Sequence, residues 1–310
     1  MERVMALLRN QAALLCACLL LLASTLTGFT AQAYTQEAPT IVVPELPVFT
    51  ENVSVQVPIL MYHMLVPDGE PTRPGLRQVS HFRNDLRALR TAGFTTITFT
   101  QLIAFATNGD ELPERPVLIT FDDGYLDNYT LGFPVLQEER AHATIFVIGW
   151  CRGRNTRESG ETINAHFSLD QAMTMYHSGW VDIQSHSYNL HERYPSPHAT
   201  RNGVLQNHGE PISRYIAALR QDIAHMQSRV FDPMGRTPTV FAYPFGYWQP
   251  QAERVLRDAG FVATVTTENR IATVYQGAPD SLFGLPRIDV QHDISSGALV
   301  TLVTEMLAEI

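Results

Sequence analysis

The fold is constrained most by an alternation of short apolar runs with helix-length segments, which continues from Val57 to Val290. Runs such as Val117–Phe121 and Ala143–Ile148 have the length and the β-branched content of buried strands. Pro211–Val230 instead carries apolar residues at helical spacing. Because strands that alternate with helices form parallel sheets with covered faces, we predict an α/β fold. About seven or eight such units in a single domain, residues 56–310, favour a distorted or incomplete (β/α) barrel.

Residues 1–33 have the pattern of an export signal. Two arginines precede an apolar core at Ala12–Ala23, and Ala31-Gln32-Ala33 is a small-residue cleavage motif. We therefore expect an exported protein, either secreted or at the cell surface, with an uncleaved membrane anchor as the alternative. Residues 34–55, which are rich in Pro, Thr and Glu, are predicted to form an extended linker.

Net charge and cysteine content limit the expected partners and the means of stabilisation. The formal charge of −9 at pH 7 argues against nucleic acid as a partner, and membrane attachment is expected only through the N-terminal segment. Cys16 and Cys18 lie inside the predicted signal, so cleavage would leave Cys151 alone. We expect a free thiol in a loop and a fold stabilised by its hydrophobic core.

Two adjacent carboxylates, Asp122 and Asp123, follow the apolar run Val117–Phe121 and precede Gly124. Burying both at a strand end is costly unless a positive charge compensates. A metal ion bound by one carboxylate, with the other free as a base, would provide that charge. A solvated Asp-Asp-Gly turn is the alternative.

Histidines follow two other predicted strands. His186 comes directly after Val181–Ser185, and His191 follows five residues later. Two imidazoles with a carboxylate and open coordination positions are typical of catalytic zinc or iron sites, although two hydrogen-bonded loop histidines are the alternative. His63 ends the first predicted strand, Val57–Tyr62, and active sites of barrels lie at the carboxyl ends of strands.

An arginine lies in the apolar segment Leu285–Val290. A buried arginine needs a carboxylate, and Asp122 is the predicted partner of Arg287. A surface pairing of Arg287 with Asp289 or Asp293 is the alternative.

Aromatic residues in and after a further predicted strand are candidates for contact with a ligand. Tyr243, Phe245, Tyr247 and Trp248 would form a stacking wall for a sugar ring or, alternatively, part of the core. The predicted substrate-binding residues are Tyr125, Tyr243, Pro244, Phe245, Gly246 and Trp248.

Three of these motifs resemble, in this order, the signature motifs of the polysaccharide deacetylases, carbohydrate esterase family 4. They are Thr120–Gly124, Ser185–Ser187 through His191, and Tyr243–Gly246. The resemblance covers roughly Val57–Val290, and it too implies a distorted (β/α) barrel.

The resemblance also implies a hydrolytic mechanism. Asp122 is then the catalytic base, and Asp123, His186 and His191 hold one divalent metal ion, with Zn²⁺ expected and other divalent transition metals as alternatives. A backbone N–H near Tyr125 would help to bind the oxyanion.

Three departures from the usual family pattern point to one branch of the family. The histidines are five apart instead of four, Phe241–Pro244 contains no arginine to hold the base, and no catalytic histidine is recognisable near the C-terminus. All three resemble the branch that includes the poly-β-1,6-N-acetylglucosamine deacetylases. By this resemblance His63 is the general acid, and Arg287 holds Asp122.

The predicted function is therefore removal of N-acetyl groups from an N-acetylglucosamine-containing polysaccharide at the cell surface. Peptidoglycan, chitin oligomers and acetylated xylan are alternative substrates. A catalytically silent glycan-binding member is an alternative of another class, but a silent module needs no base beside its metal ligands. A phosphoesterase would need a second metal-ligand set or a phosphate cradle, and the sequence shows neither.

Overall fold

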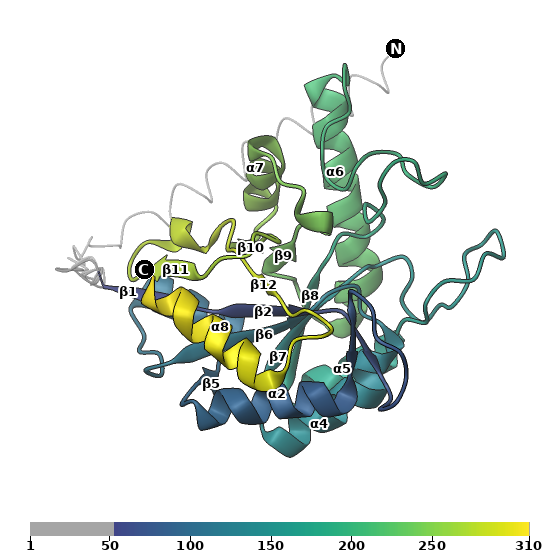
Figure 1. Ribbon diagram of the computed structural model, residues 1–310. Coiled ribbons are helices and arrows are strands. Elements are labelled where there is room, and N and C mark those ends of the chain that lie inside the picture. Colours follow the sequence, from purple (N-terminus) through teal and green to yellow (C-terminus); the bar gives the residue numbers. More distant parts are fainter. Residues whose placement is uncertain (1–52, 310) are drawn as a thin grey trace, which may run out of the picture. The chain divides into compact units, whose positions relative to one another are not determined.

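A curved parallel sheet forms the centre of the computed structural model, which describes residues 53–309. The strand order is β10-β9-β8-β7-β6-β2-β12, with β5 also paired to β6 (Figure 1). All these strands run parallel, as their alternation with helices predicts. Their bounds are β2 (Ile59–Tyr62), β5 (Thr95–Thr96), β6 (Pro116–Phe121), β7 (Ala143–Val147), β8 (Val181–Ser185), β9 (Val240–Ala242), β10 (Ala263–Val265) and β12 (Ile288–Asp289).

One segment near the C-terminus joins the two edges of this sheet. Leu285 forms a parallel bridge with Val265 of β10, and Ile288 of β12 pairs with Leu60 of β2. The sheet therefore curls into a distorted barrel, and the predicted fold class is confirmed.

Helices cover the sheet on both sides. In Figure 1, α2, α4, α5 and α8 lie along one side of the sheet, and α6 and α7 lie along the other. The α-helices are α2 (Val79–Thr91), α3 (Phe99–Asn108), α4 (Phe133–Glu139), α5 (Leu169–His177), α6 (Ile212–Met226), α7 (Pro250–Asp258) and α8 (Ser296–Ala308). Shorter π or 3₁₀ turns are η1 (Asn128–Gly132), η2 (Gln227–Phe231), η3 (Asp232–Met234), η4 (Pro244–Gly246) and η5 (Pro279–Leu282).

The first predicted strand, Val57–Tyr62, is divided in two. Pro58 separates β2 from β1 (Ser54–Val57), because proline has no N–H to continue a ladder. Strand β1 pairs antiparallel with β11 (Ala272–Tyr275) in a separate ribbon. A second ribbon joins β3 (Met64–Val66) to β4 (Leu76–Gln78).

The predicted N-terminal segments lie almost wholly outside the described residues. The export signal, residues 1–33, is not among them, and neither is most of the predicted linker, residues 34–55. The end of that linker is folded, because Ser54 and Val55 belong to β1. Among residues 53–309, no helix has the length and apolar character needed to cross a bilayer.

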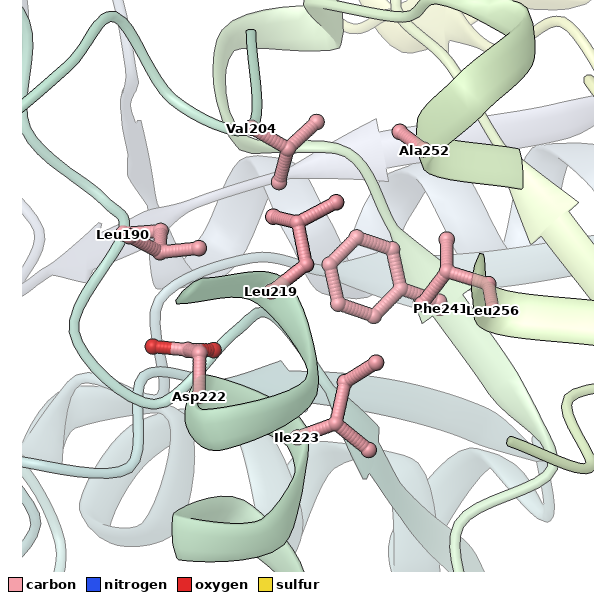
Figure 2. A pocket seen from close by; sticks show the side chains of 8 residues that line it. All are labelled: Leu190, Val204, Leu219, Asp222, Ile223, Phe241, Ala252 and Leu256. Atoms are coloured by element: carbon pink, nitrogen blue, oxygen red, sulfur yellow. The ribbon is translucent and has the colours of Figure 1, made fainter. Parts of the chain in front are cut away.

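The side chains between α6, α7 and β9 are packed tightly. Figure 2 shows apolar side chains, among them Leu219, Phe241 and Leu256, around a space of only about 10 Å³. Asp222 is the one charged residue in this group, and its carboxylate accepts hydrogen bonds from the backbone of the loop after β8. This region is core and not a ligand site.

Cys151 lies in a turn after β7 and is free, as predicted. It is buried, however, and its thiol donates to the carbonyl of Ile148 at 3.4 Å. Burial raises the pKa of this thiol, so its reactive thiolate form is disfavoured.

Candidate active site

The two adjacent aspartates occupy a sharp turn at the end of β6. Asp123 has φ 74° and Gly124 has φ 79°, so two successive residues are in the left-handed region. A Cβ atom at Gly124 would lie 3.0 Å from Val147 Cγ1, so only glycine fits there without rearrangement. The left-handed conformation of Asp123 costs on the order of 1–3 kcal/mol, a strain that is common at functional sites.

Asp122 is held by the predicted arginine. Arg287 is 0% exposed, and its Nη1 and Nη2 each lie 2.7 Å from an oxygen of the Asp122 carboxylate. The Nε–H of Arg287 donates to the carbonyl of Thr266 at 2.8 Å, which fixes the guanidinium plane. Burial alone would raise the pKa of Asp122, but Arg287 and then His186 lower it well below its ordinary value. The predicted contact is confirmed, and Asp122 is ionised at neutral pH.

Asp123 faces the two histidines instead. One ligand atom from each of Asp123, His186 and His191 can be chosen so that all three lie within 4.8 Å of one another. Oδ1 of Asp123 is 3.6 Å from Nε2 of His186 and 3.3 Å from Nε2 of His191. Strands β6 and β8 therefore bring together the three residues that the sequence predicts as metal ligands.

The protonation of His186 suits a metal ligand. Its Nδ1 lies 2.8 Å from the carbonyl of Ala242, so Nδ1 carries the proton and Nε2 presents a lone pair to the site. Burial lowers the pKa of His186 to about 4, although Asp122 and Asp123 act in the opposite direction. The imidazole is therefore neutral at physiological pH.

The charge balance also suits a divalent cation. Oδ1 of Asp123 is buried and has no hydrogen-bond partner among the described residues. Burial alone would raise the pKa of Asp123, but His191 and His186 lower it below its ordinary value. One carboxylate and two imidazoles are a normal ligand set for Zn²⁺ and related transition metals, and a metal ion would satisfy the orphaned oxygen.

Backbone strain is concentrated around this cluster. Non-glycine residues with positive φ among residues 53–309 are Asp123, Ser187, Phe245 and Arg140. The first three follow β6, β8 and β9 respectively, at the carboxyl ends of strands of the same parallel sheet. Strained residues of this kind are typical of active sites, where the surrounding fold holds them in place.

His63 lies on the same rim. It follows β2 and lines a cavity of about 560 Å³ together with Asp122, Asp123, His186 and His191. His292, the alternative histidine near the C-terminus, does not line this cavity. The acid role of His63 stays a prediction, but its location agrees with that role.

Only some of the predicted substrate-binding residues line this cavity. Tyr125 and Phe245 do, and the Phe245 ring lies 4.4 Å from the His191 ring between centroids. Burial and then the Asp123 carboxylate raise the pKa of Tyr125, which therefore stays protonated. Tyr125 pairs with His166 in an antiparallel bridge, whose two hydrogen bonds are donated by the backbone N–H groups of Leu126 and Phe167. The backbone N–H of Tyr125 takes no part in this bridge.

The side chain of Tyr243 belongs to the core, the stated alternative, and does not line the cavity. Its side chain is 0% exposed and packs against Phe241, with 5.5 Å between ring centroids, because it points into the core from the end of β9. Trp248 is 46% exposed but lies outside the cavity, with its Nε1–H donating to Glu253.

Pro244 and Gly246 also lie outside the cavity, and their contribution is to the turn that presents Phe245. Pro244 is buried, and Gly246 has φ 69°. A Cβ atom at Gly246 would lie 2.0 Å from Oγ1 of Thr267, so the turn requires glycine. Their predicted contact with substrate stays a prediction, and the structure gives both residues a part in shaping this turn.

Further residues of the cavity had not been predicted. Arg73, Pro74 and Gly75, between β3 and β4, form one wall. A Pro-Gly pair predicts a turn in the sequence, but it does not predict where in the fold that turn lies. The other unpredicted lining residues are Met61, Met64, Leu76, Asn164, Arg193, Thr267 and Asp289.

Comparison with known proteins decides the family. The model of the family described as polysaccharide deacetylase matches residues 109–264, about half of the chain. This chain belongs to the polysaccharide deacetylase family. The deacetylase motifs predicted at Thr120–Gly124 and Ser185–His191 fall inside the matched region.

Individual relatives of this polysaccharide deacetylase agree. YxkH of Bacillus subtilis (strain 168), which is named as an inferred polysaccharide deacetylase, is 27% identical over 251 residues, covering 81% of this chain and 77% of its own length. The poly-β-1,6-N-acetyl-D-glucosamine N-deacetylase of Staphylococcus epidermidis is 26% identical over 229 residues, 72% of this chain and 70% of that protein. The Escherichia coli (strain K12) enzyme of the same name is 24% identical, and the matched region spans only 34% of its length.

Solved structures have the same fold. A de-N-acetylase from Aggregatibacter actinomycetemcomitans superposes with a TM-score of 0.68 at 19% identity, covering 80% of this chain and 99% of that one. IcaB from Ammonifex degensii gives a TM-score of 0.62 at 25% identity, with 79% and 96% covered. The polysaccharide deacetylase fold therefore extends over nearly all the described residues.

Proposed function

We propose that this polysaccharide deacetylase removes N-acetyl groups from a polymer that contains N-acetylglucosamine, and that it uses one divalent metal ion. The observation that carries the proposal is that the neighbouring carboxylates Asp122 and Asp123 have different partners. An arginine holds Asp122 as an ionised base beside three side chains suited to a metal, Asp123, His186 and His191. The names of the staphylococcal and Escherichia coli relatives support an N-acetylglucosamine polymer.

Each residue has a definable part in amide hydrolysis. A bound Zn²⁺ or similar ion would act as a Lewis acid toward the acetyl carbonyl and would lower the pKa of water. Asp122 takes the proton of the attacking water, because its pKa is lowered and it stays ionised. Arg287 keeps that carboxylate in one orientation through two parallel hydrogen bonds.

The leaving group needs an acid. An amide nitrogen departs readily only when it is protonated, and His63 is the histidine of this cavity outside the ligand cluster. The backbone N–H of Tyr125, which takes no part in the bridge to His166, is the candidate donor to the oxyanion of the tetrahedral intermediate. Phe245 offers an aromatic face for contact with a sugar ring.

The experiment is acetate release from a panel of substrates by purified, zinc-loaded protein. The panel contains β-1,6-linked N-acetylglucosamine oligomers, chitin oligomers, peptidoglycan and acetylated xylan. We expect the fastest release from the β-1,6-linked oligomers and none from the Asp122→Asn variant. Release from acetylated xylan alone would overturn the proposed substrate.

We also propose that the protein is exported, on the basis of the signal-like residues 1–33. N-terminal sequencing of the protein after expression in a bacterial host tests this. Recovery outside the cytoplasm with Tyr34 at the N-terminus is the expected result, and recovery of intact chain in the cytoplasm would contradict it.

A further inference from the structure

The backbone around His63 is held by two side chains from the segment that follows the aspartate pair. Nδ2 of Asn128 donates to the carbonyl of His63 at 2.8 Å, and Oδ1 of Asp127 accepts the N–H of Leu65 at 2.7 Å. Asn128 is 1% exposed, so water does not compete for this bond. Asp127 and Asn128 thus bind the chain on both sides of Met64.

These bonds occur where the strand ladder is interrupted. His63 lies between β2 and β3 and belongs to neither strand. The carbonyl of Tyr62 accepts the N–H of Asp122 at 3.0 Å, and the N–H of Met64 donates to Gly75 at 3.0 Å. The Asn128 amide therefore binds the His63 carbonyl at the break, where β2 leaves the central sheet and β3 joins the wall of the cavity.

The pair is also internally connected. Nδ2 of Asn128 donates a second hydrogen bond to Oδ1 of Asp127 at 2.9 Å, and its backbone N–H donates to the carbonyl of Tyr125 at 3.1 Å. Asp127 and Asn128 follow Asp123 by four and five residues along the same short segment. The segment that carries the proposed base and one proposed metal ligand is therefore hydrogen-bonded directly to the segment that carries the proposed acid.

We propose that Asp127 and Asn128 are positioning residues that set the location of His63 relative to Asp122 and the metal ligands. The inference rests on the proposed function, because it concerns the general acid of that reaction. A catalytic group displaced by about 1 Å can lose about 10²-fold in rate, so one hydrogen bond to the His63 carbonyl and one to the N–H of Leu65 are enough to matter.

The test compares two substrates that differ in their need for an acid. An N-acetylglucosamine oligomer releases an amine and requires protonation of the leaving group. An aryl acetate such as 4-nitrophenyl acetate releases a stable phenolate and does not. The ratio of amide to ester turnover is independent of how much of a preparation is folded, so a destabilised variant still gives a result.

We expect Asn128→Ala to lower kcat for the amide by about 10²-fold, with KM, zinc content and ester turnover unchanged. Asp127→Ala should act in the same direction. Asp127→Asn keeps an acceptor oxygen for the N–H of Leu65, so this variant should retain most of the wild-type amide turnover. Thr130→Ala, at an exposed position of the same turn, is the matched control and should equal the wild type.

A double-mutant comparison completes the design. Asn128→Ala should cause no further loss of amide turnover in a His63→Ala background, because the residue acts through His63. Equal losses of amide and ester turnover in Asn128→Ala would overturn the inference, since that is what general distortion of the site produces.

The His63→Ala variant separates two kinds of failure. Impaired amide turnover in His63→Ala together with normal turnover in Asn128→Ala would overturn the positioning role alone. Normal amide turnover in His63→Ala would overturn the acid role in the proposed function, and the positioning role with it.

Discussion

Two chemically identical neighbours, Asp122 and Asp123, have different surroundings. Both residues follow β6, and Asp123, unlike Asp122, has a left-handed backbone. Asp122 is paired with the Arg287 guanidinium and lies 3.8 Å from Nε2 of His186, whereas Asp123 lies close to both imidazoles. At the scale of the residue, the proposed base and the proposed metal ligand are distinguished by partner and not by side-chain type.

The first prediction follows from this difference. Asp122→Asn should retain one equivalent of zinc but lose turnover by several orders of magnitude, because it removes the base and leaves the ligands. Asp123→Asn should lose zinc affinity first. Zinc titration and acetate release measure the two effects, and equal loss of zinc in both variants would show that the roles are wrongly divided.

The second prediction concerns Arg287. Removing one partner of a buried ion pair costs about 3–5 kcal/mol, so Arg287→Ala should lower the free energy of unfolding by about that amount. Arg287→Lys keeps the charge but loses the paired geometry, and it should fold while turning over more slowly than the wild type.

Denaturant unfolding and acetate release measure the effects of both variants at Arg287. An Arg287→Ala protein as stable and active as the wild type would mean that Asp122 does not depend on this partner. The Arg287→Lys variant serves as the control for charge alone.

At the scale of elements, the buried strands were the most predictable part of the chain. Strand β8 coincides with the predicted Val181–Ser185, and β6 differs from the predicted run only by including Pro116. Buried strands carry strong local patterns because both faces are apolar. The aspartates and histidines at their ends were predictable for the same reason, since parallel strands place their carboxyl ends together.

Short elements and side-chain directions were less predictable. The strands β1 and β11 are far apart in the sequence, and β3 and β4 are only three residues long each. The pairing in both ribbons therefore depends on tertiary contacts. Tyr243 follows the same strand as Phe245, yet one ring enters the core and the other faces the cavity. The turn that separates them includes a left-handed Phe245, which no local pattern of apolar residues specifies.

The third prediction belongs to helix α6, which anchors the loop between the two histidines. Asp222 accepts the N–H groups of Tyr188 and Asn189, each at 2.7 Å, from the edge of the packed region in Figure 2. Asp222→Ala should weaken zinc binding by about 10–100-fold, the usual effect of losing a group that orients a metal ligand.

Zinc affinity is measured by competition with a chelator. Gln221→Ala, at an exposed neighbouring position on α6, is the control and should bind zinc as the wild type does. Unchanged zinc affinity in Asp222→Ala would mean that the loop keeps its conformation without this carboxylate.

At the scale of the whole molecule, one segment both closes the barrel and holds Asp122. Leu285 pairs with β10 and Ile288 pairs with β2, while Arg287 between them binds Asp122. The closure was not evident from the sequence, because only two residues of the apolar segment Leu285–Val290 form β12. The predicted contact of Arg287 followed from charge alone and needed no knowledge of the closure.

The fourth prediction is that zinc stabilises the folded protein. A ligand that binds only the folded state stabilises it by about 2.7 kcal/mol at one hundred times its Kd. The Tm should therefore rise with zinc and return to its original value with a chelator. His186→Ala should show no such rise, and a Tm that does not respond to zinc in the wild type would argue against a site in the folded state.

Catalysis by a single bound metal ion is tested most directly by titrating metal-free protein with zinc and measuring acetate release from an N-acetylglucosamine oligomer. We expect activity to rise linearly and reach a plateau at one equivalent of zinc per chain, and we expect His186→Ala to stay inactive throughout. Full activity of the metal-free wild type, or equal activity of His186→Ala, would contradict catalysis by a single bound metal ion.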